Sequence, residues 1–283
     1  MILITGATGT IGSEVVRLLA ARGVPHRAMT RDPARATFGP GTEVVRGDYD
    51  DPGSLTAAVT GVDAVFLVNA PGTAAPGVHD KALLAAAEAA GVRRAVKLSA
   101  IGTGDPRSGS FSGWHAPGEQ ALRDGPPEWT VLRPTMFASN FLWWASYIKE
   151  SRPVPDQYGG GRQSVIDPVD IAAVAVEALL GDGHHGRTYT LTGPEPLSVA
   201  EMTAIVGKVI GRDLTVRDLT RAESREFLVA SGIPEEFADG VLEGLDFVRT
   251  GGNTTATDDV EQILGRAPRA FEDWARDHRD AFA

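Results

Sequence analysis

The feature that most constrains the fold is a glycine-rich turn between a short apolar run and an amphipathic pattern at the start of the chain. Residues 2–6 read ILITG and residues 11–23 read IGSEVVRLLAARG, so a predicted strand leads into a predicted helix. Gly6 permits a tight turn, Gly9 lets the backbone approach a pyrophosphate, and Gly12 lets the helix pack close to the sheet. We therefore expect a dinucleotide site here, because free amides at a helix start attract phosphate. The other members of this predicted site are Thr8, Thr10 and Ile11.

Short apolar runs alternate with helical patterns through the first half of the chain, which is typical of βαβ units around a parallel sheet. The order of the elements predicts an α/β fold with a doubly wound parallel sheet, followed by a mainly helical region. The predicted strands span residues 2–6, 26–31, 43–48, 63–68, 94–99, 129–134 and 187–193. The later predicted helices span residues 137–150, 168–180, 198–211, 220–232, 234–248 and 268–282, and a glycine-rich loop spans 155–164.

Composition excludes several classes of function. The formal net charge is −10, whereas nucleic-acid binding needs a basic face. Cysteine is absent, which excludes disulfides and thiolate chemistry. His184 and His185 lie in a predicted loop without an obvious carboxylate partner, so we expect no metal. Neither a signal peptide nor an apolar run of membrane-spanning length is recognisable, so we expect a cytoplasmic monomer or homodimer that binds no membrane.

The end of the second predicted strand bears on the choice of dinucleotide. An acidic residue at this position would bind the ribose hydroxyl of NAD and repel a phosphate. The sequence has Arg31 there and Arg35 four residues later, and a guanidinium binds phosphate oxygens with two parallel donors. We therefore expect NADP(H) in preference to NAD(H). Two alternatives stay open: Asp32 contacts the ribose instead, or both arginines are ordinary surface charges.

The loops after the third and fourth predicted strands are expected to complete the dinucleotide cleft, because ligands of such sheets bind at the carboxyl ends of the strands. Asp48 and Tyr49 are expected near the adenine. Asn69, Ala70 and Pro71 are expected near the ribose and the phosphates. Asp48 has an alternative role as the N-terminal cap of the next helix.

Several motifs together resemble the NmrA-like group of atypical short-chain dehydrogenases: GATGTIG, TRDP, GDYDDPGSL, KLSAIG, WTVLRPTMFASNF and YTLTGPEPLSVAEM. Within that group the chain is most similar to bacterial type-2 quinone reductases and to triphenylmethane reductase. The resemblance covers nearly the whole chain. It implies a Rossmann-like NAD(P)-binding domain at 1–135, completed by about 165–192, and a smaller, mostly helical substrate lobe at 136–164 and 193–283. The group contains both reductases and catalytically silent dinucleotide sensors.

Many short-chain dehydrogenases reduce ketones with a tyrosine as proton donor and a lysine that lowers the tyrosine pKa. Ser99 falls where those enzymes keep a substrate-orienting serine. The tyrosine position falls near Trp114 or His115, and the lysine position falls at Glu119. A carboxylate raises a neighbouring pKa, whereas the lysine lowers it. The tyrosine mechanism is therefore excluded in this chain.

Two interpretations of His115 and Glu119 stay open. In one, Glu119 holds the imidazole and favours its protonated form, which then donates a proton. In the other, the two side chains only pack the start of a helix against the sheet. Reduction of an isolated ketone needs such an acid, whereas a quinone or an extended aromatic system delocalises the incoming electron pair and takes its proton later. A site without the tyrosine–lysine pair therefore favours conjugated acceptors.

An aromatic segment follows the sixth predicted strand and is compatible with an aromatic substrate. Phe137, Phe141 and Trp144 are spaced so that they lie roughly on one face of a helix. We expect a flat substrate to stack on these rings, although each ring can equally belong to the core. Asn140 and Gln163 are candidate polar contacts for that substrate.

The sequence therefore predicts an NADPH-dependent oxidoreductase that transfers hydride to a quinone-like or polycyclic aromatic acceptor. Pro134 and Thr135 are expected beside the nicotinamide carboxamide. The protein is expected to supply orientation and exclusion of water more than acid–base chemistry. Two alternatives are a non-catalytic sensor of the NADP(H) redox state and a ketoreductase-type tailoring enzyme with His115 as its acid.

Overall fold

The computed structural model describes residues 1–69, 75–106 and 110–283, without the side chains of 110–112. The chain divides into two compact units, and each is described by itself. Unit 1 comprises Met1–Thr103, Gly113–Pro134 and Pro168–Thr190. Unit 2 comprises Gly104–Ser112, Thr135–Asp167 and Leu191–Ala283. The assignment of cofactor binding to one region and substrate binding to the other stays a prediction.

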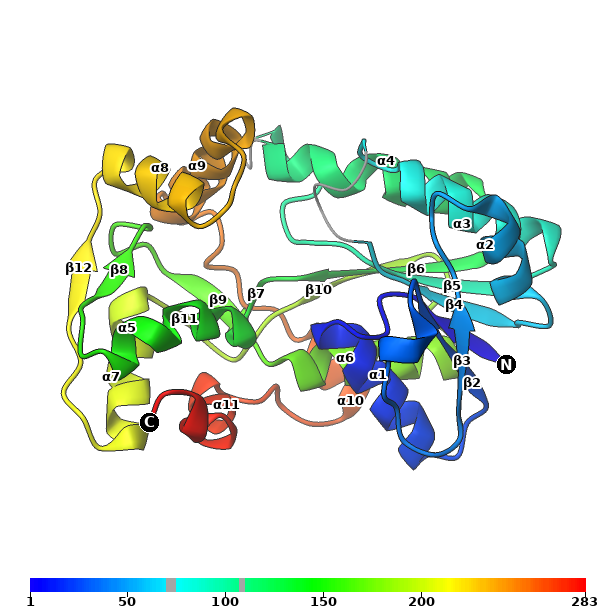
Figure 1. Ribbon diagram of the computed structural model, residues 1–283, viewed down its shortest axis with the longest axis horizontal. Helices are drawn as coiled ribbons and strands as arrows, with labels where there is room; N and C mark the ends of the chain where they lie inside the picture. The colour runs from blue at the N-terminus through cyan, green and yellow to red at the C-terminus, as the bar shows by residue number, and fades with distance from the viewer. Residues whose placement is uncertain (70–74, 107–109) are drawn as a thin grey trace. The chain divides into compact units, whose positions relative to one another are not determined.

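Unit 1 is built on a sheet whose described strands have the order β10-β6-β5-β4-β1-β2-β3 (Figure 1). The strands are β1 (Ile2–Ile4), β2 (His26–Thr30), β3 (Thr42–Arg46), β4 (Ala64–Leu67), β5 (Arg94–Leu98), β6 (Glu128–Pro134) and β10 (Arg187–Leu191). β1 pairs in parallel with both β2 and β4, and parallel pairing continues outward to β3 and to β6. The strand order therefore reverses at β1, as in Rossmann-like sheets. The predicted α/β fold is confirmed.

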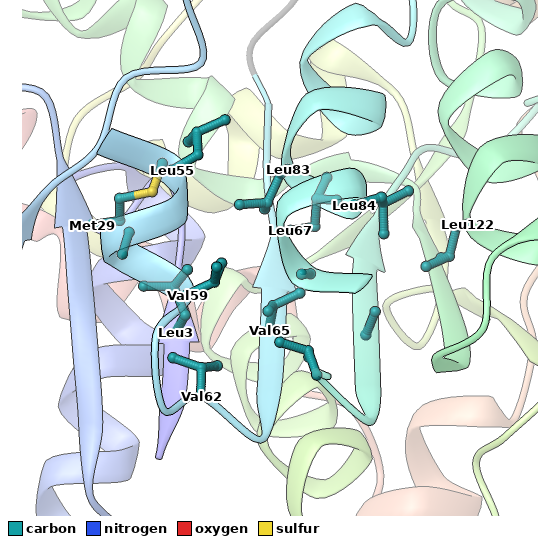
Figure 2. Packing of buried hydrophobic residues seen from close by; sticks show 14 of the residues in the cluster. Leu3, Met29, Leu55, Val59, Val62, Val65, Leu67, Leu83, Leu84 and Leu122 are labelled. Atoms are coloured by element: carbon teal, nitrogen blue, oxygen red, sulfur yellow. The ribbon is translucent and has the colours of Figure 1, made fainter. Parts of the chain in front are cut away.

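Helices cover both faces of this sheet. One face carries α1 (Thr10–Ala21) and α6 (Pro168–Leu180), and the other carries α2 (Pro52–Val59), α3 (Val78–Ala89) and α4 (Ser110–Asp124) (Figure 1). Buried aliphatic side chains fill the space between the sheet and α2, α3 and α4 (Figure 2). This core includes Leu3, Val65, Leu83 and Leu122. It fixes the parallel strands, so that the loops after their carboxyl ends begin at one edge of the sheet.

Unit 2 combines short strands with helices. Strands β7 (Met136–Phe137), β9 (Gln163–Ile166) and β11 (Pro196–Leu197) form one sheet, and β8 (Val154–Asp156) and β12 (Val216–Asp218) form another. The helices are α5 (Ala145–Lys149), α7 (Val199–Ile210), α8 (Arg221–Ala230), α9 (Glu235–Arg249), α10 (Asp259–Leu264) and α11 (Phe271–Asp277). A capping box starts α7, because the Ser198 hydroxyl accepts the N–H of Glu201 while the Glu201 carboxylate accepts the N–H of Ser198.

The structure corrects the prediction in two segments of unit 2. The helix predicted over 137–150 is a 3-10 helix at Ala138–Trp144 followed by the short helix α5. The loop predicted over 155–164 contains the end of β8 and the start of β9. Strands this short show no hydrophobic period, and a spacing of three or four residues fits both helix types. The sequence therefore could not separate these alternatives.

Aromatic side chains dominate the core of unit 2. Phe141 is fully buried, and its ring meets the rings of Trp144, Phe271 and Phe282 edge to face, with centroids 5.1, 5.4 and 5.8 Å apart. Trp144 is buried as well. The expectation that Phe141 and Trp144 offer their faces to a substrate is therefore wrong, because neighbouring side chains already cover both rings.

This packing predicts unequal costs for two substitutions in the aromatic segment. Phe141→Ala should lower the free energy of unfolding by about 4 kcal/mol, because it opens a cavity in the core. Trp143→Ala is the matched control, since Trp143 is 69% exposed, and it should change stability by less than about 0.5 kcal/mol. Urea denaturation followed by circular dichroism measures both. Equal costs would contradict the placement of Phe141 in the core.

Candidate active site

The glycine-rich turn folds tightly onto the first turn of α1. Gly6 has a φ of 58°, a conformation that favours glycine, and the N–H of Gly9 donates to the carbonyl oxygen of Gly6 at 2.9 Å. A Cβ atom on Gly12 would lie 2.2 Å from that same oxygen. No side chain fits at Gly12, so the helix and the turn approach each other as closely as backbones can.

The start of α1 presents its backbone to a ligand. Gly9 occupies the N-cap position, and no side chain caps the helix. Thr8, Gly9 and Thr10 are exposed, whereas the Ile11 side chain is buried. Unpaired amides and the helix dipole attract a phosphate. The turn therefore fits the pyrophosphate of a dinucleotide, with Ile11 available through its backbone alone.

The loop after β2 separates its acidic side chain from its basic ones. The Asp32 carboxylate accepts the N–H of Ala34 at 3.1 Å and caps the 3-10 helix Pro33–Arg35. Arg31 and Arg35 are exposed, and neither guanidinium has a polar partner among the residues that the structure describes. One oxygen of the Asp32 carboxylate is therefore used within the loop, while both guanidinium groups lack a protein partner in the described part of the chain.

The loop after β3 uses a different carboxylate as helix cap from the one that the sequence suggested. Asp51 Oδ1 accepts the N–H of Ser54 at 3.2 Å and caps α2. Asp48 instead accepts the N–H of Asp50 at 3.1 Å within the loop. The alternative role of Asp48 as the cap is therefore wrong, and its contact with adenine stays a prediction.

The Tyr49 side chain is held in place by contacts of both its hydroxyl and its ring. The hydroxyl donates to the Val68 carbonyl oxygen at 2.8 Å, and the ring stacks on that of His79 with centroids 4.7 Å apart. Burial raises the pKa of Tyr49 well above its usual value. Tyr49 is therefore a neutral, fixed phenol, and its contact with adenine stays a prediction.

Asn69 lies just beyond the end of β4. Its Nδ2 donates to Asp80 Oδ2 at 2.6 Å, whereas its Oδ1 is buried and has no partner in the described part of the chain. Ala70 and Pro71, which were expected near the ribose and the phosphates, lie outside the described residues. One end of the Asn69 amide is thus held by the protein and the other is unsatisfied.

A fully buried ion pair lies beneath this edge of the sheet. Lys97 of β5 and Asp80 of α3 are both completely buried, and Lys97 Nζ lies 2.5 Å from Asp80 Oδ1. Asp80 therefore links Lys97 to Asn69. Sequence analysis missed this pair, although the lysine inside the apolar run RAVKLS is a signal, since a lysine is buried only with a partner.

Ser99 and Glu119 lie together in a second polar cluster. Ser99 Oγ donates to Glu119 Oε1 at 2.6 Å, and Arg133 donates to the two carboxylate oxygens at 2.9 and 2.7 Å. Arg123 adds a bond of 2.7 Å to Oε2. Burial opposes the charge of Glu119, but the hydrogen bonds from Arg133 and Ser99 outweigh it and lower the pKa of Glu119. Glu119 therefore anchors α4 to β5 and β6 as a neutralised anion.

His115 lies on α4 one turn before Glu119, so the two residues do share a helix. Burial and, to a smaller extent, the charge of Lys97 together lower the pKa of His115 to about 4, against the opposing effects of Asp80 and Glu119. Its Nδ1 is buried without a partner in the described part of the chain. The expectation that Glu119 keeps this imidazole protonated is therefore wrong, because burial outweighs the carboxylate. With this pKa, His115 is expected to be neutral at pH 7.

The lowered pKa of His115 predicts a loss of stability in mild acid. The folded protein binds a proton here near pH 4 and the unfolded chain near pH 6.5, so the unfolded chain binds more protons in between and stability falls as pH falls. His115→Gln should remove about 2 kcal/mol of the stability lost between pH 7.5 and pH 5. Urea unfolding at both pH values measures this, and exposed His185→Gln is the control that should behave like wild type. An unchanged pH dependence in His115→Gln would contradict the burial of this imidazole.

The polar and half-buried residues predicted to contact substrate are differently placed. Phe137 and Asn140 are half-buried, and their contact with a substrate stays a prediction. Gln163 is buried, its Oε1 lies 3.5 Å from Asn253 Nδ2, and it shares a hydrogen bond with Tyr158. Gln163 is thus part of a buried polar cluster of unit 2.

The two residues expected beside the carboxamide stand where the chain passes from unit 1 to unit 2. Pro134 ends β6, and its carbonyl oxygen accepts the N–H of Ile101 at 2.9 Å. Thr135 uses both its N–H and its hydroxyl on the Leu191 carbonyl oxygen, at 3.0 and 3.3 Å. Their contact with the cofactor stays a prediction.

Neither a metal site nor a membrane span is found among the described residues. No three histidine or carboxylate side chains of the described chain are grouped to hold a metal ion. His184 Nδ1 pairs with the Tyr189 hydroxyl at 2.9 Å, and His185 packs edge-on against Trp129. None of the described helices combines the length and the apolar character that crossing a membrane requires.

Comparisons with known proteins agree with this geometry. Residues 6–182 match the model of a family described as NAD(P)H-binding. The chain is 42% identical to a (4-alkanoyl-5-oxo-2,5-dihydrofuran-3-yl)methyl phosphate reductase of Streptomyces griseus, covering 100% of this chain and 99% of that one. It is 36% identical to the NAD(P)H azoreductase of Xenophilus azovorans, with the same coverage. The crystal structure of an NADPH-dependent quinone oxidoreductase of Escherichia coli with NADPH superposes with a TM-score of 0.86 and 26% identity, over 97% of this chain and 98% of that one.

Proposed function

Since the chain belongs to the NAD(P)H-binding family, we propose that it is an NADPH-dependent reductase of conjugated acceptors. The resemblance to NmrA-like atypical short-chain dehydrogenases is confirmed, and the chain is an NAD(P)H-dependent oxidoreductase. The observation that carries the finer proposal is the state of the acid–base positions. Glu119 is neutralised by two arginines, and His115 is uncharged at neutral pH.

Two observations favour NADPH over NADH. Arg31 and Arg35 are exposed in the loop after β2, where the 2′-phosphate of NADPH would lie, and Asp32 Oδ1 accepts a hydrogen bond within that loop. The quinone oxidoreductase that superposes on this chain was crystallised with NADPH. A bare guanidinium gains more from a phosphate than from a ribose hydroxyl, because the bonds are charge-assisted.

The proposed chemistry needs little proton transfer from the protein. Bound NADPH supplies a hydride from the nicotinamide C4 atom. The Ser99 hydroxyl donates its hydrogen bond to Glu119, and Lys97 is buried against Asp80, so neither is a ready acid for a substrate oxygen. The chain therefore binds and orients the two reactants, and a conjugated acceptor delocalises the electron pair until it takes a proton from water. The pKa of His115 argues against the ketoreductase alternative, which requires its imidazolium.

The names of the relatives support acceptors of this kind. One relative is named an azoreductase, one structural neighbour a quinone oxidoreductase, and the 42% identical relative a reductase of the phosphate ester of an acyl-substituted unsaturated lactone. In each, the bond that accepts the hydride is conjugated or joins electronegative atoms, so the product anion is stabilised without a nearby acid. We propose that the acceptor of this chain is an aromatic, quinone-like or acyl-substituted unsaturated molecule.

Cofactor preference is tested by removing both exposed arginines. The double variant Arg31→Ala/Arg35→Ala should raise KM for NADPH at least about tenfold and change KM for NADH less than about twofold, since each lost charge-assisted bond costs roughly 1.5–3 kcal/mol at most. Steady-state kinetics with a quinone acceptor measures both constants. Arg93→Ala, an exposed arginine at the opposite end of the sheet, is the matched control. Equal losses with both cofactors would contradict a role on the 2′-phosphate.

Acceptor class is tested by NADPH oxidation in stopped flow, followed at the nicotinamide absorbance. Quinones, azo dyes and acyl-substituted unsaturated lactones should turn over, and simple ketones should react at least about a hundredfold more slowly, because the site lacks an acid worth that factor. His115→Gln should keep the rate with conjugated acceptors within about threefold. Efficient ketone reduction that His115→Gln abolishes would instead establish the ketoreductase.

A further inference from the structure

The buried pair Lys97–Asp80 interrupts an otherwise apolar face of the sheet. Ala95 and Lys97 of β5, and Ser99 just after it, are every second residue of the chain. Their side chains therefore point to the same face of the sheet, the one that α3 and α4 cover. Ala95 belongs to the aliphatic core, and Lys97 lies two residues further along the strand. Removing two charges from water costs more than burying two aliphatic side chains. Stability alone therefore does not explain why this pair is buried here.

The carboxylate of Asp80 is held in one place. Its Oδ1 faces Lys97 and its Oδ2 accepts from Asn69. A Cβ atom on Gly118 of α4 would lie 2.3 Å from Oδ2, and a Cβ atom on Gly77 would lie 2.7 Å from Cβ of Pro117. The Asp80 carboxylate of α3 is thus packed directly against the backbone of Gly118 in α4. The carboxylate has no room to rotate away from its two partners.

This fixed carboxylate selects one orientation of the Asn69 amide. An ionised carboxylate only accepts hydrogen bonds, so Asn69 must turn Nδ2 toward Asp80 and Oδ1 away from it. That Oδ1 atom is buried and unsatisfied in the described part of the chain. A buried acceptor without a donor is unfavourable, and a ligand hydroxyl would satisfy it.

The position of Asn69 indicates which hydroxyl this is. β4 borders β1 where the strand order reverses, and the Val68 N–H donates to Thr5 Oγ1 at 2.7 Å, which ties the two strand ends together. In such sheets the pyrophosphate lies over the turn after the first strand, and the adenine ribose lies toward the second. Asn69, on the other side of β1, therefore faces the nicotinamide half of the cofactor.

Resting on the proposed binding of NADPH, we propose that Lys97 and Asp80 are positioning residues that orient the Asn69 amide, so that Asn69 Oδ1 accepts a hydrogen bond from the nicotinamide-side ribose. Lys97 neutralises the charge of Asp80, and Asp80 holds Asn69 in one of its two amide orientations. Neither Lys97 nor Asp80 touches the cofactor. A purely structural pair would affect stability without selecting for this half of the ligand.

A double-mutant cycle on Asp80 and Asn69 tests the inference. The dissociation constants of NADPH and of 2′,5′-ADP, which lacks the nicotinamide-side ribose, are measured by calorimetry below the lowest melting temperature. Asp80→Asn should weaken NADPH about tenfold when Asn69 is present, because the new amide lets Asn69 flip, and less than twofold in the Asn69→Ala background. Binding of 2′,5′-ADP should stay within twofold in all four proteins. Lys81→Met, an exposed neighbour on α3, is the control and should change neither constant.

Three outcomes overturn the inference or its premise. Equal effects of Asp80→Asn in both backgrounds, or equal losses for NADPH and 2′,5′-ADP, would make the pair structural only. Absence of NADPH binding by the wild-type protein would instead overturn the proposed function. If Asp80→Asn does not fold, the cycle is repeated with Lys97→Met, in which a carboxyl buried without its cation takes up a proton and ceases to be a pure acceptor. The same pattern of constants is then expected, and additive effects overturn the inference.

Discussion

The contact between the backbone of Gly12 and the carbonyl oxygen of Gly6 determines where every other part of the candidate site can lie. It brings the first turn of α1 directly over the end of β1, the strand at which the sheet order reverses. A phosphate at that helix start is then flanked by the end of β2 on one side and the end of β4 on the other. Arg31 stands just after the first of these ends and Asn69 just beyond the second, so in the proposed binding mode the two halves of the dinucleotide would meet different side chains.

Charge is neutralised along the face of β5 as it approaches this edge. Lys97 is matched by Asp80, and Ser99 donates to Glu119, whose charge is balanced by Arg123 and Arg133. A site built in this way is rigid and contains ionic groups, but those groups are used on one another. The same residues therefore explain how helices α3 and α4 are fixed, and they support the proposal that the acceptor stabilises its own anion.

The sequence alone was sufficient to predict the α/β fold and the NAD(P)H-binding family, whereas the location of the dinucleotide site stays a prediction. A glycine turn between a strand and a helix is a local pattern, and so is the alternation of apolar runs with amphipathic segments. Both depend on residues that are neighbours in the chain, which is why the α/β class with its parallel sheet and the tight turn at Gly6 could be predicted. The prediction that this chain lacks the catalytic tyrosine and lysine also rests on local sequence, namely the motif KLSA and the helix that follows.

The tertiary structure decided which charged side chains pair with one another and which side chains are buried. The sequence suggests His115 as the partner of Glu119. Arg133, fourteen residues away on β6, contacts Glu119 only because α4 packs on the sheet. The spacing of the aromatic residues could not show whether the Phe141 ring is exposed or buried, and the structure places it in the core of unit 2. Lys97 of β5 pairs with Asp80 of α3 only because α3 packs on the sheet, and this pairing is what allows both charges to be buried. Sequence specified which residue types occupy the site, whereas packing decided which charges remain available, because that depends on neighbours distant in the chain.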